Sequence, residues 1–183
     1  MIDKSPVSPA PGELEFVRRF VNTLDIETGV DSLADAVSWK TWAAGHEVDG
    51  AASTAELAYA RDVREALRAA MLANHDRSPM PATTARLLTE AASRARFSLR
   101  FEAQSAHFTG AGAGMHETLS RVVLAVAAAM NDGTWSRLKA CVNDECQWGF
   151  YDKSRSRTGQ WCSMEICGNR AKQARWRDAS ARG

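Results

Sequence analysis

The chain has 183 residues, of which 45% are hydrophobic and 25% are charged, a composition typical of soluble globular proteins. No basic segment followed by an apolar run opens the chain, and the longest apolar stretch, residues 122–130, is too short to span a bilayer. We therefore expect a cytoplasmic protein without a membrane partner. In a reducing compartment, clustered cysteines favour a bound metal over disulfides.

The net charge of +1 conceals a division between two parts of the chain. Residues 1–134 contain 13 Lys and Arg against 17 Asp and Glu, a net charge of −4. Residues 135–183 contain 10 against 5, a net charge of +5. This division predicts two parts with different partners, and the basic part is the candidate for binding a polyanion.

Residues 1–11 contain three prolines and two serines, which predict a disordered leader. Apolar residues then recur at helical spacing from Leu14 to Leu24, so a first helix is expected there. A second helix is expected over residues 32–44, with Asp31 or Ser32 as its N-cap and Gly45 at its end.

The third expected helix is longer and opens at Ser53 and Glu56, which have the spacing of a capping box. A fourth helix is expected from Pro81 to residue 95. Alternating apolar residues predict a strand over 97–103, which residues 106–110 could close into a hairpin. A fifth helix over 115–131, with Met130 facing inward and Gly133 as its stop, completes residues 12–134. The expected fold class is α+β, with a mostly helical N-terminal domain and a small β-hairpin.

All four cysteines lie in a 27-residue segment, as two C-x4-C pairs separated by 15 residues: Cys141, Cys146, Cys162 and Cys167. A short spacer lets two thiolates bind one ion from a tight turn, so both pairs can close on a single metal. Iron is chemically feasible, but zinc is the commoner occupant of closed four-thiolate sites. We expect one structural Zn²⁺, without an open position for a catalytic water.

Between the cysteine pairs, residues 147–152 carry large alternating side chains and residues 153–159 are polar. We expect a hairpin in which residues 160–164 return along residues 147–152. A helix should follow, with Cys167 at its N-terminal end. Turn, hairpin and helix around four cysteines predict a C-terminal treble-clef-like zinc finger over residues 135–183.

Around the cysteines, a set of positions forms a distinctive pattern: Phe150, Asp152, Ser154, Arg155, Trp161, Cys162, Ser163, Met164, Cys167, Gly168, Asn169, Arg170, Ala171 and Lys172. This pattern resembles the CGNR zinc-finger family. The resemblance implies a bacterial transcription regulator whose N-terminal domain is of the ABATE type and senses a ligand. Dimerisation is the alternative role that we expect for this domain. Residues 20–28, FVNTLDIET, resemble the opening helix of that domain. The family commonly has two arginines before the tryptophan, where this chain has Gly159 and Gln160, a difference that predicts weaker DNA binding.

Basic side chains crowd the expected finger at Lys153, Arg155, Arg157, Arg170, Lys172, Arg175 and Arg177. We expect them to bind DNA phosphates, with Arg170 best placed to contact a guanine. The alternatives are a solvated basic face and a zinc-stabilised module that binds protein or RNA. Phe150 and Trp161 are expected to pack against the zinc site, and Asp152 and Asn169 to form hydrogen bonds within the turn or helix cap.

Trp39 and Trp42 share one helix face and are the candidates for a ligand pocket, although this spacing is more common in a core. A catalytic Cys–His pair would have to use one of the four cysteines expected to bind zinc, and no serine lies in a G-x-S-x-G motif. We therefore expect no enzyme. The expected partners are DNA, an unidentified small-molecule effector and a second copy of the chain.

Overall fold

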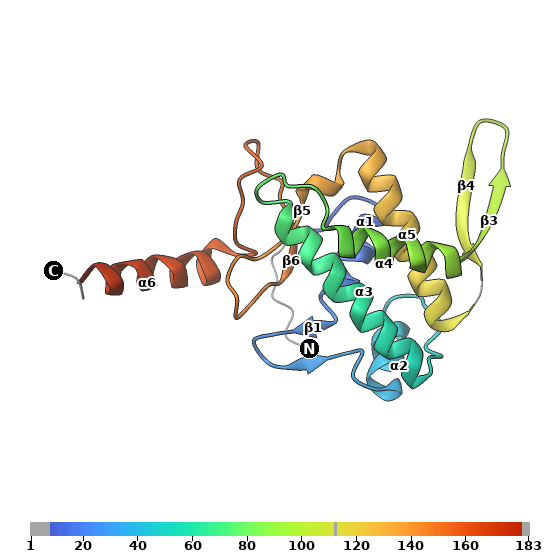
Figure 1. Cartoon of the computed structure of the whole chain (residues 1–183), viewed down its shortest axis with the longest axis horizontal. Coiled ribbons are helices and arrows are strands. Elements are labelled where there is room, and N and C mark those ends of the chain that lie inside the picture. The colour runs from blue at the N-terminus through green and yellow to red at the C-terminus, as the bar shows by residue number, and fades with distance from the viewer. Residues whose placement is uncertain (1–7, 112, 181–183) are drawn as a thin grey trace.

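The computed structural model describes residues 8–111 and 113–180. Its helices are α1 (Leu14–Val21), α2 (Ala36–Ala44), α3 (Thr54–Ala73), α4 (Ala82–Arg94), α5 (Gly114–Asp132) and α6 (Asn169–Ser180). Two short helical turns complete the set: η1 (Trp135–Arg137) precedes the cysteine segment, and η2 (Met164–Gly168) lies at its end and contains Cys167. The strands are β1 (Leu24–Asp25), β2 (Val30–Asp31), β3 (Arg96–Phe101), β4 (Ala106–Ala111), β5 (Leu138–Ala140) and β6 (Gly149–Tyr151). They form three antiparallel pairs within the described residues, so the fold is α+β, as predicted (Figure 1).

One hydrophobic core joins the helices to the start of the cysteine segment. Phe20 of α1, Leu67 of α3 and Val122 of α5 are fully buried in it. Leu138 and Ala140 of β5 belong to the same cluster and are also fully buried. Strand β5, the first strand of residues 135–183, therefore packs on the helices of residues 12–134. The predicted domain boundary between residues 134 and 135 stays a prediction.

The first two helices are shorter than their sequence patterns predicted. Helix α1 ends at Val21, and Leu24 lies in β1. Helix α2 begins at Ala36, because Asp35 is its cap and accepts hydrogen bonds from the backbone of Val37 and Ser38. Asp31 lies before the start of this helix and does not cap it; its carboxylate accepts from the Leu33 N–H at 2.8 Å and pairs with the guanidinium of Arg64 at 2.6 Å. The predicted cap is therefore wrong.

Other local signals are confirmed. Ser53 and Glu56 form the capping box of α3. Gly133 ends α5 in the left-handed conformation at φ 78°, which suits a glycine. Met130, however, is exposed rather than inward-facing, because residues 130–133 extend beyond the core.

The predicted hairpin is present as β3 and β4, and it projects from the helical body (Figure 1). Most of the predicted leader, residues 1–7, lies outside the described residues. Ala10, by contrast, is packed in the core, and its N–H donates to Glu15 at 2.8 Å. None of the helices in the described part of the chain combines the length and apolar character that crossing a bilayer requires.

Candidate metal centre and nucleic-acid interface

The four cysteine sulfurs converge on one point. All Sγ atoms of Cys141, Cys146, Cys162 and Cys167 lie within 4.8 Å of one another. The Cys146–Cys162 and Cys162–Cys167 sulfur distances are 3.7 and 3.9 Å. A zinc ion with Zn–S bonds of about 2.3 Å needs tetrahedral edges of about 3.8 Å. The donor set and its spacing therefore fit one structural Zn²⁺.

The first cysteine pair lies on a turn between β5 and β6. The Cys141 N–H donates to the Trp148 carbonyl at 3.0 Å, and the Cys146 N–H donates to the Asn143 carbonyl at 2.8 Å. Gln147 adopts a left-handed φ of 44° where the turn rejoins β6. These contacts direct both sulfurs toward the same side of the turn.

The partner of β6 differs from the prediction. Strand β6 pairs with β5, with Lys139 opposite Phe150, and not with residues 160–164. Leu138 and Ala140 offer a fully buried strand, whereas Gln160 of the returning segment is exposed. The Val142 N–H donates to the Gln160 carbonyl at 3.0 Å, which links the returning segment to the first turn.

The second cysteine pair leads directly into α6, as predicted. Ser163 caps the turn η2, and Cys167 lies near the end of that turn. Trp161 packs against the cysteine cluster together with Trp148, which confirms the expected role of Trp161. Phe150 was expected beside the metal site as well. It is buried, with its ring centroid 6.3 Å from that of His75, and is not among the side chains packed on the cysteine cluster.

The crowded thiols need a cation. A hydrogen bond with Cys146 raises the pKa of the Cys141 thiol to about 12. Contacts with Cys141 and Cys146, together with burial, raise the pKa of Cys162 as well. Neighbouring thiolates repel one another, and a dication at the centre of the four sulfurs would relieve that repulsion.

A buried ion pair, which the sequence analysis did not identify, shapes the basic loop of residues 152–159. Lys139 donates from Nζ to the Asp152 carboxylate at 2.9 Å and to the Arg157 carbonyl at 2.7 Å. The side chains of Lys139 and Asp152 are only 1% and 3% exposed. Asp152 also accepts from the backbone of Ser154 and Gly159, so its predicted role within the turn is confirmed. The one signal in the sequence was a lysine between apolar residues, Leu138-Lys139-Ala140.

All seven basic residues expected to bind DNA are exposed, in two groups beside the metal centre. The loop carries Lys153, Arg155 and Arg157, and α6 carries Arg170, Lys172, Arg175 and Arg177. Arg170 is also paired, since its guanidinium lies 2.7 Å from the carboxylate of Glu27 in the β1–β2 turn. Asn169 donates to the Glu165 carbonyl at 2.9 Å, as expected for a residue at the helix start.

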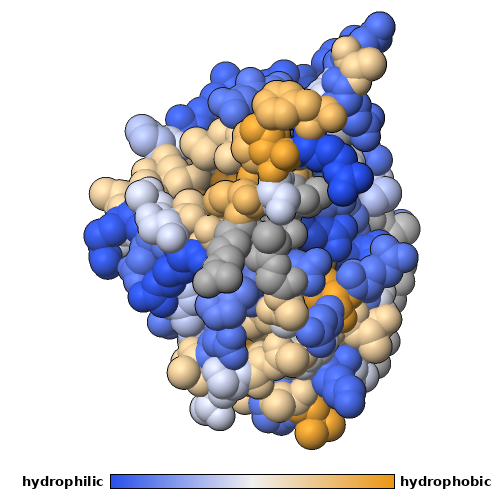
Figure 2. All heavy atoms as spheres, turned by 90° about the vertical axis from the view of Figure 1, so that its right-hand side faces the viewer, coloured by the Kyte–Doolittle hydropathy of each residue, from blue (hydrophilic) through white to orange (hydrophobic). Residues whose placement is uncertain are grey.

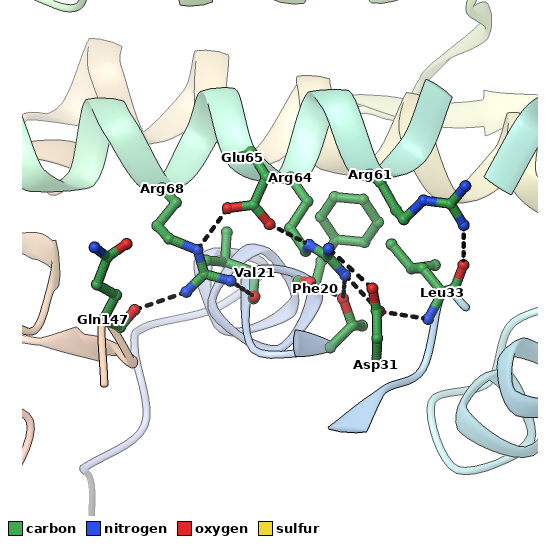
Figure 3. Close-up of polar contacts among 10 residues, drawn as sticks. Phe20, Val21, Asp31, Leu33, Arg61, Arg64, Glu65, Arg68 and Gln147 are labelled. Carbon is green, nitrogen blue, oxygen red and sulfur yellow. Dashed lines mark hydrogen bonds and ion pairs between the residues drawn. The ribbon is translucent and has the colours of Figure 1, made fainter. Parts of the chain in front are cut away.

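Arginine side chains of α3 bind the backbone of the first cysteine turn and of the end of α1 (Figure 3). The Arg68 guanidinium donates to the Gln147 carbonyl at 2.7 Å, to the Val21 carbonyl at 2.9 Å and to Glu65 at 2.9 Å. Its side chain is 2% exposed. One turn earlier, Arg64 pairs with Asp31. The arginines on this side of α3 thus tie together segments far apart in the chain.

Asn22 and Gly149 form a second link between these parts. The Asn22 side chain accepts from the Gly149 N–H at 2.6 Å and donates to the Gly149 carbonyl at 3.0 Å. A Cβ at position 149 would lie 2.9 Å from the Met71 Cε and 3.0 Å from the Asn22 Oδ1, so glycine makes this close approach easier. Beyond the C-terminal end of α3, the His75 Nε2 lies 2.6 Å from the Ala140 carbonyl oxygen, a third link between these parts.

The two candidate pocket tryptophans belong to the core. Trp39 is fully buried and stacks on Trp42 with ring centroids 5.1 Å apart. A cavity of about 160 Å³ lies elsewhere, between α3, α4 and the start of α5. Its lining is mainly apolar and includes Tyr59, Arg94 and Met115.

Family comparisons agree with this architecture. Residues 137–179 match the CGNR zinc finger, and residues 15–132 match the ABATE family, described as "Putative stress-induced transcription regulator". No curated protein matches the chain. Because the ABATE match covers more than half of the chain, this protein belongs to the ABATE family and carries a CGNR zinc finger at its C-terminal end.

Proposed function

We propose that the protein is a transcription regulator that binds DNA through the zinc finger, using the basic loop (residues 152–159) and α6. The main support for this proposal is that α6 is basic and exposed. It contains four Lys and Arg residues, and almost all of its residues with described side chains are exposed. It also projects away from the helical body (Figure 1). A helix of 12 residues is marginal in water without a partner. A phosphate backbone supplies one that matches its charge.

The four-cysteine metal site is of the kind that supports a binding role. Four thiolates complete a tetrahedral site and leave no position for a water, so the metal would shape the finger without taking part in a reaction. We propose that the protein acts by binding and not by catalysis. A metal held by the four cysteines would connect the loop to α6, because Cys162 and Cys167 lie between these two segments in the chain.

The test is binding of random-sequence duplex DNA by the zinc-loaded protein over a series of salt concentrations. Each phosphate contact contributes about −0.9 to the slope of log K against log salt. Lys172→Ala and Arg175→Ala should each weaken binding and reduce the slope by about 1. Lys40→Ala is the matched control, because Lys40 is an exposed lysine on α2. Absence of binding at low salt, with zinc bound stoichiometrically, would refute autonomous DNA binding.

A second candidate role is a protein- or RNA-binding finger. It is favoured by exposed apolar side chains on η2 and α6, since Met164, Ile166 and Trp176 are 54%, 42% and 72% exposed. Association anchored by such side chains should change little with salt, unlike a phosphate contact. Salt-insensitive capture of a partner that Trp176→Ala abolishes would support this role.

We further propose that the cavity between α3, α4 and α5 is the effector site. The Tyr59 hydroxyl is buried there without a hydrogen-bond partner in the described part of the chain. A small ligand with an apolar body and one acceptor would satisfy it. Ligand-observed NMR with benzamide tests this, and Tyr59→Phe should weaken binding about tenfold. If benzamide does not bind, or binds the variant equally well, this site does not recognise such ligands.

A further inference from the structure

The hairpin of β3 and β4 has one apolar face. Leu99 lies opposite Phe108 in the register, and Phe97 and Phe101 flank Leu99 at two-residue spacing. Because side chains alternate between the two faces of a strand, these four lie on the same face. Ser98 and Arg100 occupy the other face. We call the first group the hairpin face: Phe97, Leu99, Phe101 and Phe108.

This face is exposed to an extent that needs explanation. Phe97, Phe101 and Phe108 are 38%, 74% and 60% exposed. At about 200 Å² for each phenylalanine, the three rings leave roughly 340 Å² uncovered. That alone reaches the size of the largest apolar patch on a typical monomer, about 300–600 Å². Figure 2, which looks onto this end of the molecule, shows hydrophobic side chains gathered on the surface.

The hairpin also lacks the support that two strands need. An isolated two-stranded hairpin is marginally stable in water and gains stability when its apolar face packs on another layer. Beyond its base, where it meets the start of α5, the hairpin projects from the body (Figure 1). Its apolar face is therefore suited to burial by another molecule.

We propose that the hairpin face packs against the same face of a second copy of this chain. The face is self-complementary, because it carries no charged side chain that a symmetric contact would bury. Two copies cover roughly 700 Å² from the phenylalanine rings alone. Leu99 and the strand backbones extend this area toward the roughly 1,200 Å² at which specific interfaces begin.

The position of the hairpin is compatible with the finger remaining free. The hairpin and α6 lie at opposite ends of the molecule, so pairing through the hairpin leaves the basic residues uncovered (Figure 1). The inference does not depend on DNA binding. A dimer would nevertheless supply two fingers, and a single finger contacts few base pairs.

Sedimentation velocity of the full zinc-loaded chain, from low to high micromolar concentration, tests the proposal. The wild-type protein should pass from 20.0 kDa to twice that mass. Leu99→Arg should raise the dimer dissociation constant by at least about 100-fold, because it places a charge in the interface. Ser98→Arg is the matched control: it puts the same charge at the adjacent position on the other face and should leave the dimer intact.

A monomer at every concentration, or equal behaviour of the two variants, would overturn the proposal. Zinc content and far-UV circular dichroism establish that each variant is folded. A second pair avoids introducing a charge: Phe101→Ser should also prevent association, whereas Val37→Ser, at an exposed valine on α2, should not. Random-DNA binding by Leu99→Arg separates the two proposals, because the substitution leaves the finger unchanged. Loss of the dimer with retained DNA binding is the expected result.

Discussion

Replacing Asp152 by Asn tests the claim that a buried ion pair shapes the basic loop. The substitution keeps the size of the side chain but removes its charge, which leaves the Lys139 ammonium buried without a counter-ion, beside neutral carbonyl acceptors. Removing one partner of a buried pair typically costs about 3–5 kcal/mol. For a chain of this size, that lowers the thermal midpoint by roughly 10 °C.

The assay is equilibrium denaturation of the zinc-loaded protein, followed by tryptophan fluorescence and circular dichroism. Asp144→Asn is the control, because Asp144 is exposed in the same cysteine turn and should change stability by less than about 0.5 kcal/mol. The double variant Lys139→Met/Asp152→Leu should recover only part of the loss, since it removes both charges but leaves the Ser154 and Gly159 N–H groups without their acceptor. Equal stability of Asp152→Asn and Asp144→Asn would refute the reasoning.

Acid should reduce the difference between wild type and Asp152→Asn. Burial opposes ionisation of Asp152, but hydrogen bonds from Ser154, Lys139 and Gly159 outweigh it and lower the pKa from 3.8 to about 2. A lowered pKa means that the ionised carboxylate stabilises the fold above pH 3.8 and that this contribution is lost as pH falls through about 2. The shift corresponds to about 2 kcal/mol. The stability difference should therefore narrow by about that amount between pH 4 and 2, measured on zinc-free samples of both proteins because acid protonates the cysteine thiolates that would hold the ion.

Three further predictions concern the finger. Glu27→Ala should release Arg170 and tighten DNA binding about two- to fivefold at low salt, measured by fluorescence anisotropy, and no change would mean that the ion pair does not compete with DNA. Gln160→Arg should also tighten binding, because residue 160 is exposed, whereas Gly159→Arg should destabilise the finger in thermal unfolding, since a Cβ there lies 2.9 Å from the Asp152 carboxylate carbon. Chelating the zinc, or the substitution Cys162→Ser, should lower the thermal unfolding midpoint of the helices as well as that of the finger. Unchanged hydrogen-exchange protection of the helices after chelation would contradict this prediction.

Short-range patterns predicted the elements whose ends depend on their own residues. The capping box at Ser53 and Glu56 and the left-handed Gly133 are determined by hydrogen bonds within a few positions, so the sequence is enough to locate them. The shared metal site of the four cysteines was predicted for a similar reason, because the spacing within each cysteine pair is a local property.

Features that depend on docking of distant segments were missed. Asp31 looked like a helix cap but pairs with Arg64, 33 positions away. Lys139 is a charged residue in a strand, and its burial depends on the loop that folds over it and brings Asp152 within 2.9 Å. The pattern of large side chains in residues 147–152 predicted a strand correctly, but it could not say which neighbour the strand would pair with.

The same long-range contacts make the zinc finger part of the helical fold. Arg68 reaches the Gln147 carbonyl across 79 positions, and Asn22 reaches Gly149 across 127. Both acceptors lie at the end of the turn that carries Cys141 and Cys146. If that turn opened, the almost fully buried Arg68 guanidinium would lose one of its partners, which is costly for a buried charge. Metal binding and packing of α3 therefore stabilise each other. By linkage, a ligand bound between α3, α4 and α5 could influence the finger only if it favours one arrangement of α3 over another.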